Sequence, residues 1–594
     1  MIETRRRIRA LHDELFEVDL DYHLARQAAD QLSPVQVNAL AIRASAKERS
    51  SKNESTAAIE AELAELRKTL TSKQRIAAKL EGFELLNAPQ TLVTSERLQG
   101  ALGGSEALVL AFSHGKPMVD PLTAKKGPDT SEKGYVLVLR NSGEPTLITC
   151  PELPVLTSRI RAFTYGLSGR GNVRLGGWDR SGNQPSKDDA IGQRIIDEQD
   201  AMSEPEMESF WSDQSRAMQT TLWDPLVESG ALEGVDRILL ATAGDLHNLP
   251  FEPGREAAGA PEMFHVNSLA MFALGRGLYN QSVQGSHGVT RTSTGEPAPF
   301  ERSLATVLCW PGEYGEPSYL PFANAERDAT HALWVSRLGR DAVTSGSSHP
   351  WEPAEDVDVL HVACHGDVLK EKDRTPRPVM RLRPEGEIDS GLVGEREFLK
   401  GPKAREILMN ICVGGQVFDD SFDGNPTGLV AGALRHGAHT IVASLLPVPD
   451  EHGYLFGVLA TLLMTDRGLA LAAATGVAKR VMAGVPKKDD DADGLIRLFC
   501  ETRAKRLMRL MELDDATLEQ ELWQLTNNDP NMSWLDDTFI ADLIGDRPKN
   551  LSDMTDFVHG RTTILSELAQ DPAASGVITY GMTVFGDPIR IKSK

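Results

Sequence analysis

Two stretches of the sequence decide the fold: DVLHVACHGD (358–367) and EILMNICVGG (406–415). Each is a continuous apolar run that breaks into a reactive side chain and glycine, with His365 and Gly366 in the first and Cys412 and then two glycines in the second. Continuous apolar strands are typical of a parallel sheet that is buried on both faces. Because the working residues of such sheets lie at the carboxyl ends of the strands, we expect His365 and Cys412 to face each other across one edge of the sheet.

The same pattern extends on both sides of these stretches. LATVLCW (304–310) and TIVASLL (440–446) are also apolar, and helical patterns separate the runs. Upstream, short apolar runs end in turn residues, as strands do, in EALVLAFSHG, GYVLVLRNSG, PTLITCPEL and DRILLATAG. The alternation of strands and helices predicts an α/β fold with a mainly parallel sheet.

Polar breaks divide the chain into regions. Residues 1–95 are helical in pattern, with one apolar stripe at 59, 63, 66 and 70. Two interpretations stay open for this region: a helical hairpin packed on the main body, or a docking module for a partner. After Gly484 the charged break PKKDDDADG introduces a strongly helical stretch. We therefore interpret 485–574 as a helical insertion in the α/β domain.

The charge and the cysteines exclude several function classes. The chain has 594 residues, with 63 Lys and Arg against 85 Asp and Glu, so its formal net charge is −22. Such an acidic protein is a poor general nucleic-acid binder, because phosphate contacts need dense Lys and Arg patches. No run approaches the roughly 18 apolar residues of a membrane span, and the N-terminus lacks a secretory signal. The five scattered cysteines argue against a disulfide framework, so we expect a cytoplasmic protein with reduced thiols, no membrane contact and no direct nucleic-acid partner.

The residue types suit nucleophilic catalysis. A thiol becomes a strong nucleophile when a nearby imidazole takes its proton, so Cys412 and His365 can act as a pair. Gly366 and the turn after Cys412 lack bulk, which lets backbone N–H groups point at a developing oxyanion. The alternative is that Cys412 and His365 are ordinary core residues. Zinc binding by His361, Cys364 and His365 is disfavoured, because Cys364 points away from the two histidines on a strand, and we expect no metal and no cofactor.

With these residues in view, the sequence resembles a known family. The 47 positions between His365 and Cys412 fit the caspase arrangement, in which the histidine lies roughly 50 residues upstream. Both stretches are similar to the catalytic strands of CHAT proteins, bacterial relatives of caspases and separases. The resemblance continues in family order through RILLATAGDLHNLPFEP, LPFANAERDA, TGLVAGALRHGAHTIVASLLPVPDE and YGMTVFGDP.

The resemblance implies a fold and a domain organisation. The fold would be a caspase-like three-layer sandwich with a mainly parallel sheet, in which an inactive half precedes the active half. We therefore assign 1–95 to an N-terminal helical region and 101–300 to a pseudo-protease half. Residues 301–594 form the active caspase-like half, with the helical insertion at 485–574.

The resemblance also implies residue roles. His365 corresponds to the catalytic histidine and Cys412 to the nucleophile, and the N–H groups of Gly366 and Cys412 would form the oxyanion hole. In separases an acidic residue after the next strand receives a basic P1 side chain. Asp450 stands at the matching place with Glu451 beside it, so both are predicted to bind substrate.

Departures from the family pattern bear on specificity. Asn410 and Ile411 stand where the caspase signature has Gln and Ala, so a caspase preference for Asp at P1 is not expected. Leu446 stands where the family usually has Trp. Asp450 has a second interpretation as the cap of the helix that starts EHGYLFG, since Asp is well suited to that position. Other acidic candidates for the P1 pocket closely follow the nucleophile: Asp419, Asp420 and Asp423.

We therefore predict a caspase-like cysteine endopeptidase that cleaves a protein substrate after a basic residue. The resemblance further implies an activating protein partner in a bacterial antiviral defence pathway, in the setting of a gasdermin or a CRISPR effector system. The alternative is a catalytically silent caspase-fold scaffold for protein–protein interaction, which has no need to keep His365 and Cys412. A serine hydrolase is disfavoured, because no G-x-S-x-G turn follows a strand.

Overall fold

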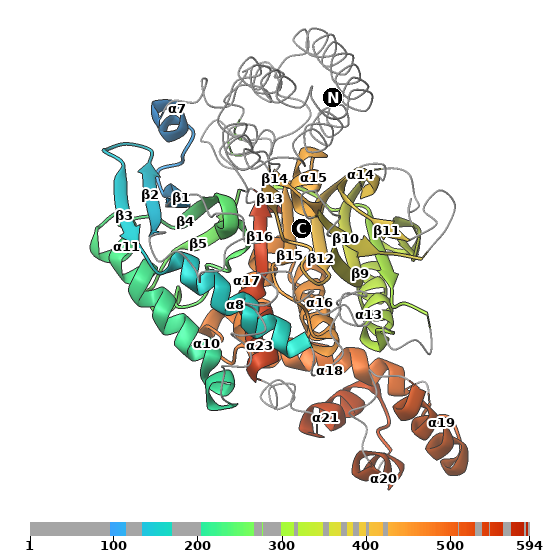
Figure 1. Cartoon of the computed structure of the whole chain (residues 1–594). Coiled ribbons are helices and arrows are strands. Elements are labelled where there is room, and N and C mark those ends of the chain that lie inside the picture. Colours follow the sequence, from blue (N-terminus) through green and yellow to red (C-terminus); the bar gives the residue numbers. More distant parts are fainter. Residues whose placement is uncertain are drawn as a thin grey trace, which may run out of the picture.

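The structure is a computed structural model of the chain, and it describes most of the α/β body (Figure 1). The predicted helical region 1–95 lies outside the described residues except for its last position, and so do residues 169–203. The described residues are 95–114, 133–168, 204–266, 272, 276, 299–313, 319–348, 356–369, 377–383, 391–398, 403–419, 426–508, 510–528, 537–545, 547–561, 572–586 and 590–591.

Strands and helices alternate along the described chain. The strands are β1 Glu106–His114, β2 Lys133–Arg140, β3 Thr146–Cys150, β4 Arg237–Thr242, β5 Glu262–His265, β6 Pro299–Phe300, β7 Ala305–Trp310, β8 Val343–Gly346, β9 Val357–Leu369, β10 Arg377–Arg381, β11 Leu392–Val393, β12 Ala404–Asn410, β13 Phe418–Asp419, β14 Pro426–Thr427, β15 Thr440–Ser444, β16 Met582–Gly586 and β17 Arg590–Ile591. The helices are α7 Ser95–Gly100, α8 Leu153–Ser168, α10 Glu204–Met218, η1 Gln219–Trp223, α11 Asp224–Glu228, η2 Gly244–Asn248, α13 Pro321–Leu338, η3 Arg340–Ala342, α14 Glu395–Phe398, α15 Leu429–Arg435, α16 Asp450–Thr465, α17 Leu471–Met482, η4 Lys488–Asp490, α18 Ala492–Met508, α19 Asp515–Asn528, α20 Asp537–Gly545, α21 Leu551–Arg561 and α23 Pro572–Gly581.

Most of these strands form one large sheet. Along its main path the order is β11-β10-β9-β12-β15-β16-β5-β4-β1-β2-β3, and β7 and β8 join beside β9. The central strands β9, β12 and β15 run parallel to one another, as do β1, β4 and β5. The mainly parallel α/β fold predicted from the apolar runs is therefore confirmed.

Helices cover both faces of the sheet and make it the middle of three layers. On one face α13, α16 and α17 share a core with strand residues such as Val359 and Leu408. On the other face α8, α10 and α15 share a second core with Leu360 and Ile407. Because consecutive residues of a strand point to opposite faces, each apolar run fills both cores. This is the three-layer sandwich predicted above.

The strands before residue 300 and those after it meet where β5 pairs with β16, at His265 and Phe585. Within 485–574, α18 packs on α16 and on α21 (Figure 1). The division into a pseudo-protease half, an active half and a helical insertion stays a prediction. None of the helices in the described ranges combines the length and apolarity that crossing a membrane takes.

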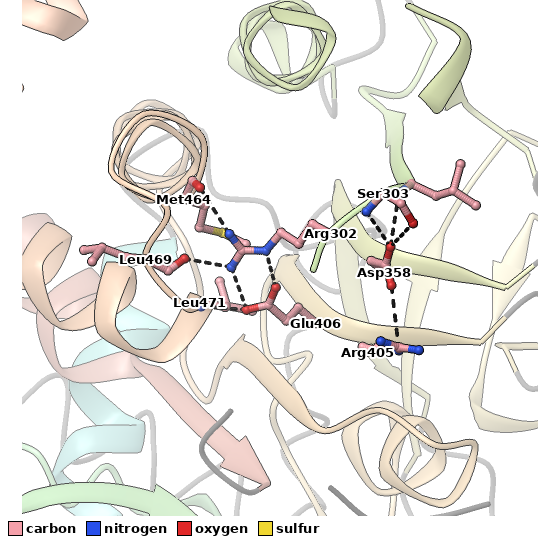
Figure 2. Close-up of polar contacts among 9 residues, drawn as sticks. Arg302, Ser303, Asp358, Arg405, Glu406, Met464, Leu469 and Leu471 are labelled. Carbon is pink, nitrogen blue, oxygen red and sulfur yellow. Dashed lines mark hydrogen bonds and ion pairs between the residues drawn. The ribbon is translucent and has the colours of Figure 1, made fainter. Parts of the chain in front are cut away.

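A buried ion pair fixes the start of β12 (Figure 2). Arg302 donates from Nε to Glu406 Oε2 at 2.5 Å and from Nη2 to Glu406 Oε1 at 2.9 Å. It also donates to the carbonyl oxygens of Met464 and Leu469, while the first N–H of α17 donates to the same carboxylate. Glu406 is fully buried. The pair therefore ties the strand that leads to Cys412 to the turn between α16 and α17.

We expect Arg302→Met to lower the free energy of unfolding by about 3–5 kcal/mol, because it leaves the Glu406 carboxylate buried without its cation. Arg405→Ala is the matched control. Arg405 pairs with Asp358 at 3.7 Å, but its side chain is 49% exposed, so its loss should cost less than about 1 kcal/mol. Urea denaturation of both variants measures the difference. Equal losses would contradict the weight given to the Arg302–Glu406 pair.

Candidate active site

His365 and Cys412 come from neighbouring parallel strands and lie level with each other. The last register pair between β9 and β12 joins Ala363 to Asn410, and each candidate residue is two positions further on. The two backbones touch just beyond that pair. A methyl group at Gly366 would lie 1.9 Å from the carbonyl oxygen of Cys412. Only glycine allows this approach, which explains the residue type after the histidine.

Strand β9 does not end at the histidine, as the sequence suggested, but continues to Leu369. Residues 359–364 of β9 pair with β7, and residues 365–369 pair with the antiparallel β10. The new partner replaces the old one at His365, so the strand keeps a hydrogen-bonded neighbour past the glycine. β12, in contrast, ends at Asn410, and residues 411–415 form a turn.

The candidate nucleophile is closed off from solvent. Cys412 is fully buried, and His365 is 2% exposed. The N–H of Val448 donates to the Cys412 sulfur at 3.0 Å, and the sulfur lies 3.7 Å from the carbonyl oxygen of the same residue. The thiol therefore contacts the backbone of the segment after β15. A substrate carbonyl needs that segment or the turn after Cys412 to move.

The turn after Cys412 contains a strained residue. Val413 has φ of 50°, a left-handed conformation that is unfavourable for a β-branched side chain. Its N–H donates to Leu446 O at 3.2 Å, and the N–H of Gly415 donates to Ser444 O at 2.8 Å. Such strain persists only where surrounding contacts hold it, and it is common at active sites. The turn is thus held by the end of β15 and the residues that follow it.

A buried carboxylate links the two strands beneath the candidate pair. Glu326 of α13 accepts a hydrogen bond from Asn410 Nδ2 at 2.6 Å, and its Oε1 lies 2.6 Å from His361 Nε2. Asn410 Nδ2 also donates to Gly453 O in α16. All three side chains are nearly or fully buried. Glu326 therefore holds His361, four residues before His365, and Asn410, two residues before Cys412. Sequence reasoning missed this role, although Glu326 lies within the LPFANAERDA motif.

A second carboxylate stands next to the candidate histidine. Asp367 is on the same face of β9 as His365, two residues on. Burial raises the pKa of Asp367 to about 6, against the opposing effects of the Val368 N–H and of Arg381. Arg381 of β10 stands opposite His365 of β9 in the register of the antiparallel pair. A carboxyl with a pKa raised to about 6 and a cation therefore flank the candidate base. No motif in the sequence indicated the arginine.

Asp450, the residue predicted to bind the substrate's P1 side chain, accepts a hydrogen bond from the protein backbone. Its Oδ2 accepts the N–H of Phe322 at 2.9 Å, in the first turn of α13, and the side chain is 2% exposed. The residue before that helix is Leu320, whose side chain cannot cap it. Asp450 thus caps α13, not its own helix, whereas Glu451 is exposed. Of the other acidic candidates, 420 and 423 lie outside the described residues.

Metal ligation has no support in the described part of the chain. Among those residues, no three His, Cys, Asp and Glu side chains gather as metal ligands would. His361, considered above as a zinc ligand, has its Nε2 beside the Glu326 carboxylate.

The sandwich, with its parallel central strands and helices on both faces, has the three-layer arrangement expected from the sequence. Residues 212–495 match the family model of the CHAT domain, so the resemblance seen in the sequence is confirmed for this part of the chain. Two solved structures of the Saccharomyces cerevisiae separase–securin complex are also similar, at 9% and 11% identity and TM-scores of 0.36 and 0.32. These matches cover 68% and 67% of this chain but only 30% of the separase chain. No curated protein matches the chain.

We expect Gly457→Ala to destabilise the protein by about 1–3 kcal/mol, the usual cost of forcing a methyl into a packed core. In most helices this change stabilises, because alanine is the better helix former. Here the new methyl would lie 2.2 Å from Glu326 Oε1 and 3.1 Å from Asn410 Nδ2.

The control for this change is Gly476→Ala in α17. Its methyl would contact only the flexible end of Arg480, at 3.4 Å, so a small gain in stability is expected. Thermal unfolding of both variants measures the sign. A stabilised Gly457→Ala variant would contradict the tight packing of Glu326.

Proposed function

We propose that the protein is a caspase-like cysteine endopeptidase with Cys412 as nucleophile and His365 as general base. The observation that carries the proposal is the backbone contact between Gly366 and Cys412, which sets His365 of β9 level with Cys412 in the turn that follows the adjoining parallel strand β12. The CHAT match over residues 212–495 supports the same class of chemistry. The Glu326 link beneath the pair supports it further, because it holds both strands in one register.

The reaction follows from the chemistry of the two side chains. His365 takes the thiol proton, and the Cys412 sulfur attacks the scissile carbonyl carbon. The N–H groups of Gly366 and Cys412 stabilise the oxyanion of the tetrahedral intermediate, a kind of contact worth about 10²–10³ in rate per donor. His365 then gives its proton to the leaving amine. Water hydrolyses the thioester in a second step and regenerates the thiol.

We further propose that a protein partner switches the enzyme on. The supporting observation is the closed site, in which Cys412 is fully buried and bonded to Val448. The proposed contact surfaces are region 1–95, which is predicted to be helical, and region 485–574, because neither is assigned a catalytic task. The bacterial defence setting and the cytoplasmic location belong to the same proposal. The silent-scaffold alternative also fits a buried thiol, so a test must read chemistry at Cys412.

Cys412→Ala and His365→Ala should each abolish cleavage of a peptide library and labelling by a peptidyl acyloxymethyl ketone, while leaving the fold intact. Cys364→Ala is the control, since Cys364 is a buried core residue on the opposite face of β9 from His365. It should change stability more than chemistry. Mass spectrometry of the labelled peptide identifies the nucleophile. Activity of Cys412→Ala within about tenfold of wild type would refute the assignment, and absence of any label, even with a cell extract as the source of the partner, would favour the scaffold.

Asp450→Asn should lower cleavage after Arg or Lys by roughly 10–100-fold if the carboxylate binds a basic P1 side chain, since such a charged bond is worth about 1.5–3 kcal/mol. The variant keeps an oxygen that can accept the Phe322 N–H, so the cap of α13 is retained. Asp450→Ala removes both functions. Profiling of P1 together with thermal unfolding separates them. Unchanged P1 preference in Asp450→Asn, with lower stability only in Asp450→Ala, would leave Asp450 a purely structural cap.

A further inference from the structure

Asn248 binds the backbone of the segment behind the candidate nucleophile. Its Nδ2 donates to Val417 O at 3.1 Å, and its Oδ1 accepts the Val417 N–H at 2.9 Å. The two residues are 169 positions apart, and both are buried. One side-chain amide thus takes the place of a neighbouring strand for a single residue. Val417 is five residues after Cys412.

Asn248 is well supported on its own side. It is the last residue of η2, which follows β4 directly, and η2 packs against α8 and β13. His247 Nδ1 lies 2.9 Å from Thr242 Oγ1, and Leu246 and Leu249 on either side are buried. The asparagine therefore projects from a fixed turn of the segment before residue 300.

The other described hydrogen bonds of the loop 411–417 are made with residues after position 300. Val413 and Gly415 donate to carbonyl oxygens around the end of β15, and Gln416 Nε2 donates to Leu445 O at 3.0 Å. Among the described hydrogen bonds of this loop, only those of Asn248 come from the segment before residue 300. They lie at the end of the loop, just after the strained Val413 turn.

We propose that Asn248 is a positioning residue: through Val417, it holds the loop that carries Cys412 in its closed arrangement. The inference rests on the proposed function only in taking Cys412 as the nucleophile. An asparagine amide carries a donor and an acceptor on two separate atoms, which match the N–H and the C=O of one peptide residue. Alanine has neither group, an aspartate carboxylate only accepts, and a serine hydroxyl has both on a single oxygen. Loss of the two Asn248 bonds frees the loop end and opens the thiol.

The test is the rate at which iodoacetamide alkylates Cys412 in the full chain, read by mass spectrometry of each cysteine peptide. Asn248→Ala removes both bonds, and alkylation of Cys412 should become about 10–30-fold faster, because two net hydrogen bonds no longer oppose loop opening. Asn248→Asp has nearly the same volume and keeps the acceptor but loses the donor. It should also speed alkylation, and it serves where the alanine variant does not fold.

The other cysteines supply the internal control. Four further thiols are buried, at 150, 309, 364 and 500, and their rates should not change. Trp223→Phe is the matched variant: it removes another buried side-chain bond, from Trp223 Nε1 to Pro253 O at 3.2 Å, in the same segment of the chain. It should leave Cys412 at the wild-type rate.

Two results would overturn the inference. One is an unchanged Cys412 rate in folded Asn248→Ala and Asn248→Asp. The other is an equal acceleration at all five cysteines, which indicates general loosening. Neither result depends on peptide cleavage, since alkylation needs no catalysis. Conversely, full activity of Cys412→Ala would refute the proposed protease mechanism and leave the loop contact standing.

Discussion

The parallel pairing of β9 with β12 is the constraint on which the site depends. The register that joins Ala363 to Asn410 determines where His365 and Cys412 end up. It also presses the backbone at 366 onto Cys412, so that no side chain fits there. A slip of one strand by one residue would turn its side chains to the opposite face and leave His365 and Cys412 on different faces of the sheet. The rest of the fold can be understood as a set of contacts that prevent such a shift.

Buried charges provide those contacts at three levels of the sheet. Glu406 with Arg302 holds the start of β12, and Glu326 holds its end against β9. At the junction of β5 and β16, Glu252 lies 2.7 Å from Arg255 and 3.5 Å from Lys479. Burial raises the pKa of Glu252, but the two cations outweigh it and hold the pKa below its ordinary value. Burial also lowers the pKa of the nearby His265 to about 3, so this histidine is neutral at physiological pH. Buried ion pairs are weak sources of stability, but breaking one is costly, which suits a role in fixing register.

The sequence predicted the parts of the fold that depend on local pattern. Apolar runs identified β7, β9, β12 and β15, and the helical patterns that separate them correspond to α13 and α15. What it could not predict are partners that lie far apart along the chain. Nothing near Asn248 indicates a bond to Val417, 169 positions later, and nothing near Asp450 indicates that it caps α13. The end of β9 was misplaced for the same reason, since β10 replaces β7 as its partner at His365. The turn residues His365 and Gly366 indicated a strand end that tertiary pairing overrides.

In the closed site, the backbone strain at Val413 is opposed by the hydrogen bonds that hold the loop. A β-branched residue held in the left-handed region costs of the order of 1–3 kcal/mol, and Val413 has that conformation directly after Cys412. Against it stand the hydrogen bonds of the loop to the end of β15 and to Asn248, each with a net value of about 1 kcal/mol. Five such bonds outweigh the strain, but once the two to Asn248 are released the remaining three are comparable with it, so the strained turn can relax. A site built in this way needs no large rearrangement of the sheet to open. The segment before residue 300 is coupled to the turn after Cys412 through η2, because η2 ends on Asn248, the residue that binds the loop.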